Sequence, residues 1–213
     1  MTDVTRLRDQ IARVGASLFD RGLTAGSSGN ISVRLPEGGW LMTPTNVSLG
    51  TLDPARLALF DAGGRLLSGD APTKEAFLHF AMYGERATAG AVVHLHSSHA
   101  TAVSILRDVD PGDVLPALTA YYIMRVGRLP LVPYFAPGDP DLAQAVRALA
   151  GRHHAVLLAN HGPVVAGRTL EDAQFAVEEL EEAAKLFLLL QNQALRLLTP
   201  TQIADLRNRF NLS

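Results

Sequence analysis

The spacing of hydrophobic residues changes along the chain and predicts where helices and strands alternate. Apolar positions three or four residues apart predict helices over residues 4–23, a stretch that follows Thr73, and residues 98–106, 115–126, 140–149, 171–190 and 199–210. Short apolar runs bounded by turn-forming residues predict strands at residues 31–34, 40–43, 57–60, 65–67, 91–96, 155–159 and 164–166. We therefore expect an α/β fold in a single domain (residues 1–213), with a mixed, mainly antiparallel central sheet flanked by helices.

The strand predicted near residue 94 carries two histidines that are two residues apart. Side chains alternate between the faces of a strand, so His94 and His96 point the same way while Val93 and Leu95 point the other way. Two imidazoles on one rigid face can bind one divalent metal ion. The alternative is a pair of polar residues on the solvent side of an ordinary strand, and an isolated His-x-His favours that alternative.

Two further residues change this balance. His161 lies at the tip of a hairpin between two apolar strands and could supply a third imidazole, although a lone histidine in a turn is usually only a turn residue. Glu75 follows Thr73, the predicted N-cap of a helix, so it lies in the first turn, where the helix dipole alone would favour a carboxylate. With three imidazoles nearby, Glu75 could instead be the fourth ligand or a base beside the metal.

The remaining histidines are not predicted to bind metal. His79 is one helical turn after Glu75, and we expect it to pack or to form hydrogen bonds around the site. His99 could support the site in the same way, and a structural role is equally compatible with its position. His153 and His154 lie after Gly151 and Arg152 in a polar loop and are expected to be solvated.

Composition restricts the chemistry. The chain has no cysteine, so a metal would be held by histidine and carboxylate side chains. The formal net charge is −2 and the basic residues are scattered, which does not favour a nucleic-acid partner. The sequence has no apolar run long enough for a membrane span and no apolar core of a signal peptide, so we expect a cytoplasmic protein without a membrane partner.

Five short motifs, in this order, resemble the class II aldolase/adducin head family over nearly the whole chain. They are Gly-Ser-Ser-Gly-Asn at residues 26–30, Thr-Pro-Thr at 43–45, Pro-Thr-Lys-Glu at 72–75, His-Leu-His at 94–96 and Asn-His-Gly at 160–162. The resemblance implies a three-layer sandwich fold, one Zn²⁺ or another divalent metal per subunit, and a homo-oligomer that is commonly a tetramer. By position, His94, His96 and His161 match the zinc ligands, and Glu75 matches the acidic residue that ligates zinc or accepts a proton.

The resemblance also implies roles in substrate binding and catalysis. Tyr121 or Tyr122 falls near the catalytic tyrosine of the aldolases, which reaches the site of a neighbouring subunit. Lys74 stands where the family usually has a hydroxyl residue, and its cation would suit a substrate that carries a carboxylate as well as a phosphate. The residues that match the substrate-binding segments are Gly29, Asn30, Thr45, Asn46, Thr73 and Lys74.

Within this family the chain most resembles the 3-oxo-tetronate 4-phosphate decarboxylases. That implies a zinc-dependent carbon–carbon lyase, which releases CO₂ from a small phosphorylated sugar acid and gives dihydroxyacetone phosphate through a zinc-bound enediolate. A zinc aldolase or 4-epimerase acting on a sugar phosphate would use the same site and stays open. So do a Schiff-base aldolase that uses Lys74 and an adducin-type assembly module without activity.

Overall fold

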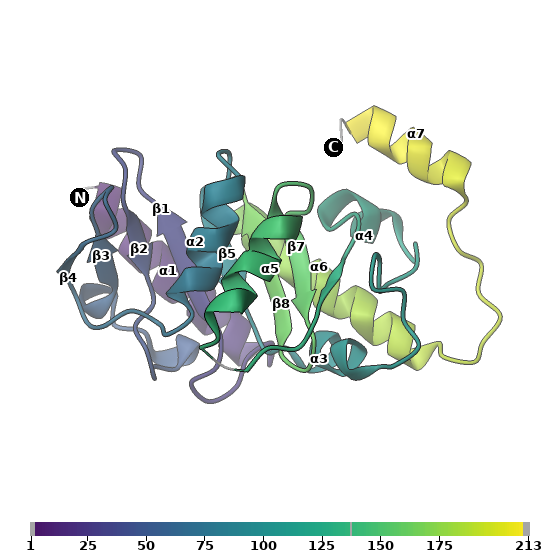
Figure 1. Cartoon of the computed structure of the whole chain (residues 1–213), viewed down its shortest axis with the longest axis horizontal. Coiled ribbons are helices and arrows are strands. Elements are labelled where there is room, and N and C mark those ends of the chain that lie inside the picture. Colours follow the sequence, from purple (N-terminus) through teal and green to yellow (C-terminus); the bar gives the residue numbers. More distant parts are fainter. Residues whose placement is uncertain (1–2, 137, 211–213) are drawn as a thin grey trace.

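One eight-stranded sheet forms the centre of the molecule, between two layers of helices (Figure 1). The computed structural model describes residues 3–136 and 138–210. The strand order is β4-β3-β2-β1-β5-β8-β7-β6, in which β6 and β7 are parallel and the other neighbours are antiparallel. The predicted mixed, mainly antiparallel sheet is therefore confirmed. The strands are β1 Asn30–Arg34, β2 Trp40–Met42, β3 Ala58–Phe60, β4 Leu66–Ser68, β5 Ala91–His94, β6 Leu131–Val132, β7 Ala155–Leu158 and β8 Gly162–Gly167.

Helices cover both faces of the sheet. On one face α2 packs against α5, and on the other α1 lies against β1 while α6 lies against β5 and β8 (Figure 1). The short helices α3 and α4 pack on α6. The helices are α1 Asp3–Asp20, α2 Ala76–Glu85, α3 Ser98–Ile105, α4 Ala120–Arg125, α5 Pro140–Ala150, α6 Leu170–Leu189 and α7 Pro200–Phe210.

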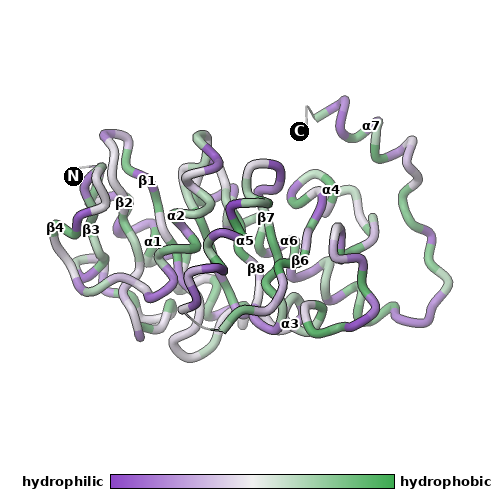
Figure 2. The backbone as a smooth tube through the Cα atoms, viewed as in Figure 1, coloured by the Kyte–Doolittle hydropathy of each residue, from purple (hydrophilic) through white to green (hydrophobic). Residues whose placement is uncertain are grey.

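Strand alternation divides the core into two parts. Val93 is buried with the residues of α1 and α6, whereas its neighbour Val92 is buried with those of α2 and α5. The apolar stretches of β7 and β8 stand out in Figure 2 against the more hydrophilic loops. By the same alternation, Asn30 and Ser32 of β1 and His94 of β5 all face α2. The α2 face therefore receives the polar residues of the two central strands.

The helix predicted over residues 115–126 is shorter than expected. α4 begins only at Ala120, because the Thr119 side chain accepts a hydrogen bond from the Tyr122 backbone N–H and so caps the helix there. Pro116 lies in the non-helical stretch before it. The strand predicted over residues 91–96 also ends early, at His94.

The last helix, α7, follows an extended stretch of chain and packs on α4 (Figure 1). None of its described residues is buried, although Ile203 and Leu206 are half-buried against the core. Within the described residues, no helix combines the length and the apolar character that crossing a bilayer requires.

Candidate metal centre

Four side chains meet at one end of β5. Ligand atoms of Glu75, His94, His96 and His161 all lie within 4.8 Å of one another. The Nε2 atom of His94 is 3.2 Å from that of His96 and 3.3 Å from that of His161, and the last two are 2.9 Å apart. The Glu75 carboxylate faces this group, with Oε2 3.4 Å from His94 Nε2 and Oε1 3.1 Å from His161 Nε2. The structure thus brings together the residues expected to hold a metal.

The three histidines lie at the end of β5, just beyond it and in the turn before β8. His94 is the last residue of β5, and the Leu95 N–H still bonds the Pro163 carbonyl, so the chain stays extended and His96 projects on the same side. His161 lies in the turn between β7 and β8, where the Thr101 hydroxyl donates a hydrogen bond to its carbonyl. Because β5 and β8 are adjacent, the turn places the third imidazole beside the other two.

Glu75 reaches the group from the opposite side, immediately before α2. The prediction that Thr73 caps this helix is wrong: α2 begins at Ala76, and Glu75 occupies the N-cap position. The Thr73 hydroxyl instead accepts a hydrogen bond from the Glu75 N–H, 3.2 Å away. The Glu75 carboxylate makes no capping bond to α2 and points to the histidines, so its place is not explained by the helix dipole alone.

The protonation of the group suits metal binding. His94 Nδ1 lies 2.8 Å from the Pro163 carbonyl oxygen, which can only accept, so Nδ1 carries the proton and Nε2 offers a lone pair. Burial lowers the pKa of His96 to about 4, and the nearby His94 and His161 contribute to this lowering. Burial raises the pKa of Glu75, but hydrogen bonds and charge from His161 and His94 outweigh it and hold the pKa well below its ordinary value.

This arrangement fits a divalent transition metal. In a tetrahedral site with metal–nitrogen bonds of about 2.0–2.1 Å, the ligand nitrogens are roughly 3.3 Å apart. The separations of 2.9 to 3.3 Å between the three Nε2 atoms are close to that value. A carboxylate as the fourth group is usual for such ions.

Asn30 and His79 stand behind the Glu75 carboxylate. The Asn30 side-chain N–H donates to Glu75 Oε2 at 2.8 Å, and its carbonyl oxygen bonds His79 Nε2. The expected supporting role of His79 is confirmed. Asn30, expected to hold substrate, is only 4% exposed, so substrate contact would need its backbone or the second hydrogen of its amide.

The other expected substrate-binding residues lie in loops that are linked to Glu75 or to His94 along the chain or by backbone contacts. The Thr45 N–H bonds the Ala71 carbonyl and the Thr73 N–H bonds the Thr43 carbonyl, so the loops that contain Asn46 and Lys74 run side by side. Asn46 and Lys74 are exposed, and Thr73 is buried. Gly29 has φ 79° and lies against the carbonyl of His94, where a Cβ would come within 3.1 Å.

The two candidate tyrosines differ in exposure. Tyr122 is 1% exposed, its hydroxyl has no hydrogen-bond partner within the described chain, and burial raises its pKa. Tyr121 is 62% exposed on α4, which packs on α6 and α7. The buried position argues against Tyr122 as a group that reaches substrate and leaves Tyr121 as the accessible one.

The sequence did not reveal how the site is supported. Ser32 and Tyr83 join His79 in a buried hydrogen-bonded group, and neither was expected there. The available signal was the spacing of Asn30 and Ser32 on one strand face and of His79 and Tyr83 one helical turn apart. His99 bonds Glu181 of α6. His154, expected to be solvated, is half-buried and bonds the Arg125 carbonyl.

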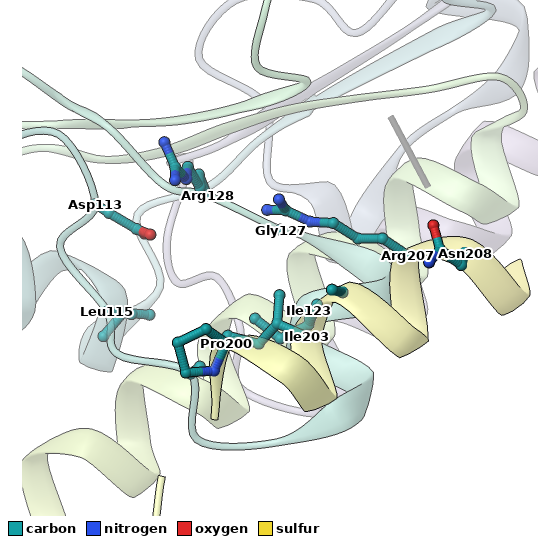
Figure 3. Close-up of a pocket in the computed structure, with 11 residues that line it drawn as sticks. Asp113, Leu115, Ile123, Gly127, Arg128, Pro200, Ile203, Arg207 and Asn208 are labelled. Carbon is teal, nitrogen blue, oxygen red and sulfur yellow. The ribbon is translucent and has the colours of Figure 1, made fainter. Parts of the chain in front are cut away.

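A separate cavity of about 430 Å³ lies between α7 and the chain around α4 (Figure 3). Asp113 and Arg128 line it from one side and Arg207 from α7. Burial raises the pKa of Asp113, although the hydrogen bond from the Leu129 N–H and the charge of Arg128 partly offset this effect. The lining residues include no member of the Glu75–histidine group, so this cavity is distinct from the candidate centre.

Comparison with known proteins agrees with this geometry. Over 202 residues the chain is 48% identical to the 3-oxo-tetronate 4-phosphate decarboxylase of Escherichia coli (strain K12), and the alignment covers 95% of each protein. It is 34% identical over 185 residues to the L-fuculose phosphate aldolase of the same strain, covering 86% of this chain and 83% of the aldolase.

Structural similarity extends over the same length. The crystal structure of YgbL from Escherichia coli matches with a TM-score of 0.94 and 46% sequence identity, covering 97% of this chain and 100% of that chain. The model of the Class II Aldolase and Adducin N-terminal domain matches residues 9–188. The chain therefore belongs to the class II aldolase and adducin N-terminal domain family.

Proposed function

We propose that this protein is a metal-dependent carbon–carbon lyase that converts a 3-oxo-tetronate 4-phosphate into dihydroxyacetone phosphate and CO₂. The observation that carries the proposal is the 48% identity, over 95% of both chains, to a protein named for that reaction. The gathering of one carboxylate and three imidazoles at the end of β5 supports it, because the reaction needs a group that stabilises negative charge on an oxygen.

Decarboxylation of a 3-oxo acid breaks the bond between C1 and C2. The electron pair stays on C2, in conjugation with the C3 carbonyl, and C2 then takes up a proton. A divalent metal held by Glu75, His94, His96 and His161 would supply a Lewis acid for the carbonyl oxygen. Glu75 is the carboxylate at this place, and it can accept a proton from a substrate hydroxyl or water and return it at C2.

The loops beside the site suit a substrate with two anionic ends. Lys74 presents an exposed ammonium group directly before Glu75, and the loop that contains Thr45 and Asn46 lies alongside. Hydroxyl groups and backbone N–H groups of such loops bind phosphate, while the ammonium group can pair with the carboxylate. We therefore assign the substrate's charged ends to the loops around residues 43–46 and 72–75.

The second candidate is a metal-dependent aldolase or 4-epimerase acting on a sugar phosphate. The 34% identity to the L-fuculose phosphate aldolase favours it, because an aldol cleavage leaves the electron pair in the same position as decarboxylation does. The metal group serves both reactions equally well. The substrate, and not the metal, distinguishes them.

The deciding experiment is incubation of the metal-loaded protein with 3-oxo-tetronate 4-phosphate and, separately, with fuculose 1-phosphate. We expect CO₂ and dihydroxyacetone phosphate in equal amounts from the first substrate and little turnover of the second. A chelator should abolish the activity, and added Zn²⁺ should restore it. Cleavage of the sugar phosphate without release of CO₂ from the oxo acid would replace the decarboxylase by the aldolase.

We further propose zinc as the metal, a tetramer as the assembly and the cytoplasm as the location. Three imidazoles and a carboxylate are ligands that zinc commonly takes, and elemental analysis of the purified protein tests the identity of the metal. Exposed apolar side chains support an assembly of several copies, among them Tyr121, Leu189 and Leu195. A phosphorylated substrate carries charges that keep it inside a membrane-bounded compartment, which fits the cytoplasm.

A further inference from the structure

A continuous chain of buried hydrogen bonds connects Glu75 with the interior of the protein. From the Glu75 carboxylate it passes through Asn30 and His79 to Ser32 and ends at Tyr83. His79 Nδ1 is 2.7 Å from Ser32 Oγ, which is 2.9 Å from the Tyr83 hydroxyl. Behind Glu75, each of these side chains is at most 4% exposed, so water does not compete for these bonds.

The carboxylate fixes the direction of every bond in the chain. A carboxylate only accepts, so the Asn30 N–H points to Glu75 and the Asn30 carbonyl oxygen points to His79. His79 Nε2 must therefore donate. Burial lowers the pKa of His79 to about 3, so the ring is neutral and its Nδ1 accepts from the Ser32 hydroxyl. Ser32 has no second proton to give, so the Tyr83 hydroxyl donates to it.

This series of hydrogen bonds orients the Asn30 amide and does not conduct protons. A neutral amide such as Asn30 does not readily accept a proton and release another, so the path from Tyr83 to Glu75 is interrupted there. What the chain provides is a fixed Asn30 amide. Held in this way, Asn30 binds Glu75 Oε2, and Oε1 remains on the side of His161.

We propose that His79 is a positioning residue of the metal centre: by donating to Asn30, it fixes the amide that orients the Glu75 carboxylate toward His94 and His161. The inference rests on the proposed function, in which Glu75 ligates the metal or carries a proton. The inference gives β1 and α2 a role in the metal centre, because they carry the residues that hold Asn30 in place. Hydrogen bonds that orient a metal-binding group typically change metal affinity or activity by about 10- to 100-fold.

The test compares the zinc affinity of three variants with that of the wild type, by titrating the metal-free proteins with Zn²⁺ in competition with a chromogenic chelator. We expect His79→Leu to bind zinc roughly 10- to 100-fold more weakly. His79→Gln should recover part of the loss, because its amide N–H can donate to Asn30. His154→Leu is the matched control, since it removes a half-buried histidine that bonds one backbone carbonyl away from the site.

Two further measurements separate positioning from general damage to the fold. Nitrogen NMR of the wild-type imidazoles should show His79 as the neutral tautomer protonated at Nε2 between pH 5 and 8, which needs no variant to fold. With 3-oxo-tetronate 4-phosphate, His79→Leu should lower kcat while KM stays within about two-fold, because the residue does not contact substrate.

The outcomes distinguish the inference from the proposed function. Equal zinc affinity of the wild type and His79→Leu, or an Nδ1-protonated tautomer, would overturn the inference and leave the decarboxylase intact. Zinc binding that is weakened in His79→Leu, partly recovered in His79→Gln and unchanged in His154→Leu would support the inference. If the same wild type released no CO₂, the decarboxylase would be refuted and the inference would stand. An equal loss in His154→Leu would also overturn the inference, since it would show a general effect on stability.

Discussion

Gly162 is the residue that lets the third histidine approach the other two. Its φ is 153°, and a Cβ built on it would lie 2.2 Å from the Leu95 carbonyl oxygen and 3.2 Å from the His96 Cα. A side chain at this position would therefore push the turn that carries His161 away from the segment that carries His96. The three histidines can therefore come together only because residue 162 has no Cβ.

We expect Gly162→Ala to weaken zinc binding strongly and to lower the free energy of unfolding by about 1–3 kcal/mol, as overpacking against backbone usually does. Gly151→Ala is the control, because Gly151 has helical dihedral angles and a Cβ added there would have nothing within 4 Å. That change should leave zinc affinity unaltered and stabilise slightly. Urea unfolding and zinc titration of both variants give the two quantities, and equal behaviour would contradict this account of the turn.

His79 also makes stability depend on pH. Burial lowers its pKa to about 3, whereas in an unfolded chain the pKa is about 6.5. Between these values the unfolded state binds more protons, so the free energy of unfolding of the metal-free protein should fall as pH falls from about 6.5, by up to about 1.4 kcal/mol per pH unit from this residue. Urea titrations from pH 7 to pH 5 should show this slope, and in His79→Gln it should be smaller.

At the scale of elements, two helix starts show how the site shapes the secondary structure. α2 begins with Glu75 in the N-cap position, yet the carboxylate serves the histidines and leaves the helix without a side-chain cap from that residue. α3, which begins two residues after His96, is capped by another helix. Glu181 of α6 accepts hydrogen bonds from the backbone N–H groups of His99 and Ala100, each at 2.9 Å.

Glu181→Ala should lower the free energy of unfolding by about 1–2 kcal/mol, the usual effect of losing a helix cap. The neighbouring Glu182→Ala is the control. Glu182 is exposed, and its carboxylate comes no closer than 3.8 Å to the Lys185 ammonium group. Such a surface ion pair contributes about 0–1 kcal/mol to stability. Thermal or urea unfolding of the two variants measures the difference. If both changed stability equally, Glu181 would not be acting as a cap.

For the whole molecule, the sequence could predict the helices and strands, because these depend on the local pattern of apolar and polar residues. The alternation around His94 and the helical spacing before Leu189 indicated the right elements, because burial of one face imposes its period on the sequence. The meeting of His161 with His94 depends on the pairing of β5 with β8, which joins segments about 70 residues apart and leaves no mark on local pattern. The direction of the Glu75 side chain, away from α2, depends on tertiary contacts in the same way. So do the buried hydrogen bonds that connect Asn30 with Tyr83.

Exposed apolar residues lie at the end of α6 and in the stretch that follows it. Leu189 is 68% exposed, and Leu195 and Leu197 are also exposed in the stretch that leads to α7. Such a group in water favours contact with another copy of the chain. We expect light scattering after gel filtration to give a mass of several subunits, and Leu189→Asp to lower that mass. A monomeric wild type at micromolar concentration would contradict this.

The pairing of β1 with β5 places Asn30 directly opposite His94. A slip of one strand by one residue would turn its side chains to the opposite face of the sheet, so the amide that anchors the carboxylate and the metal ligand would lie on different faces. A chain with shifted strands would thus be unable to hold an ion even with every side chain intact. Capture of the ion after synthesis would then act as a check that the strands have paired correctly.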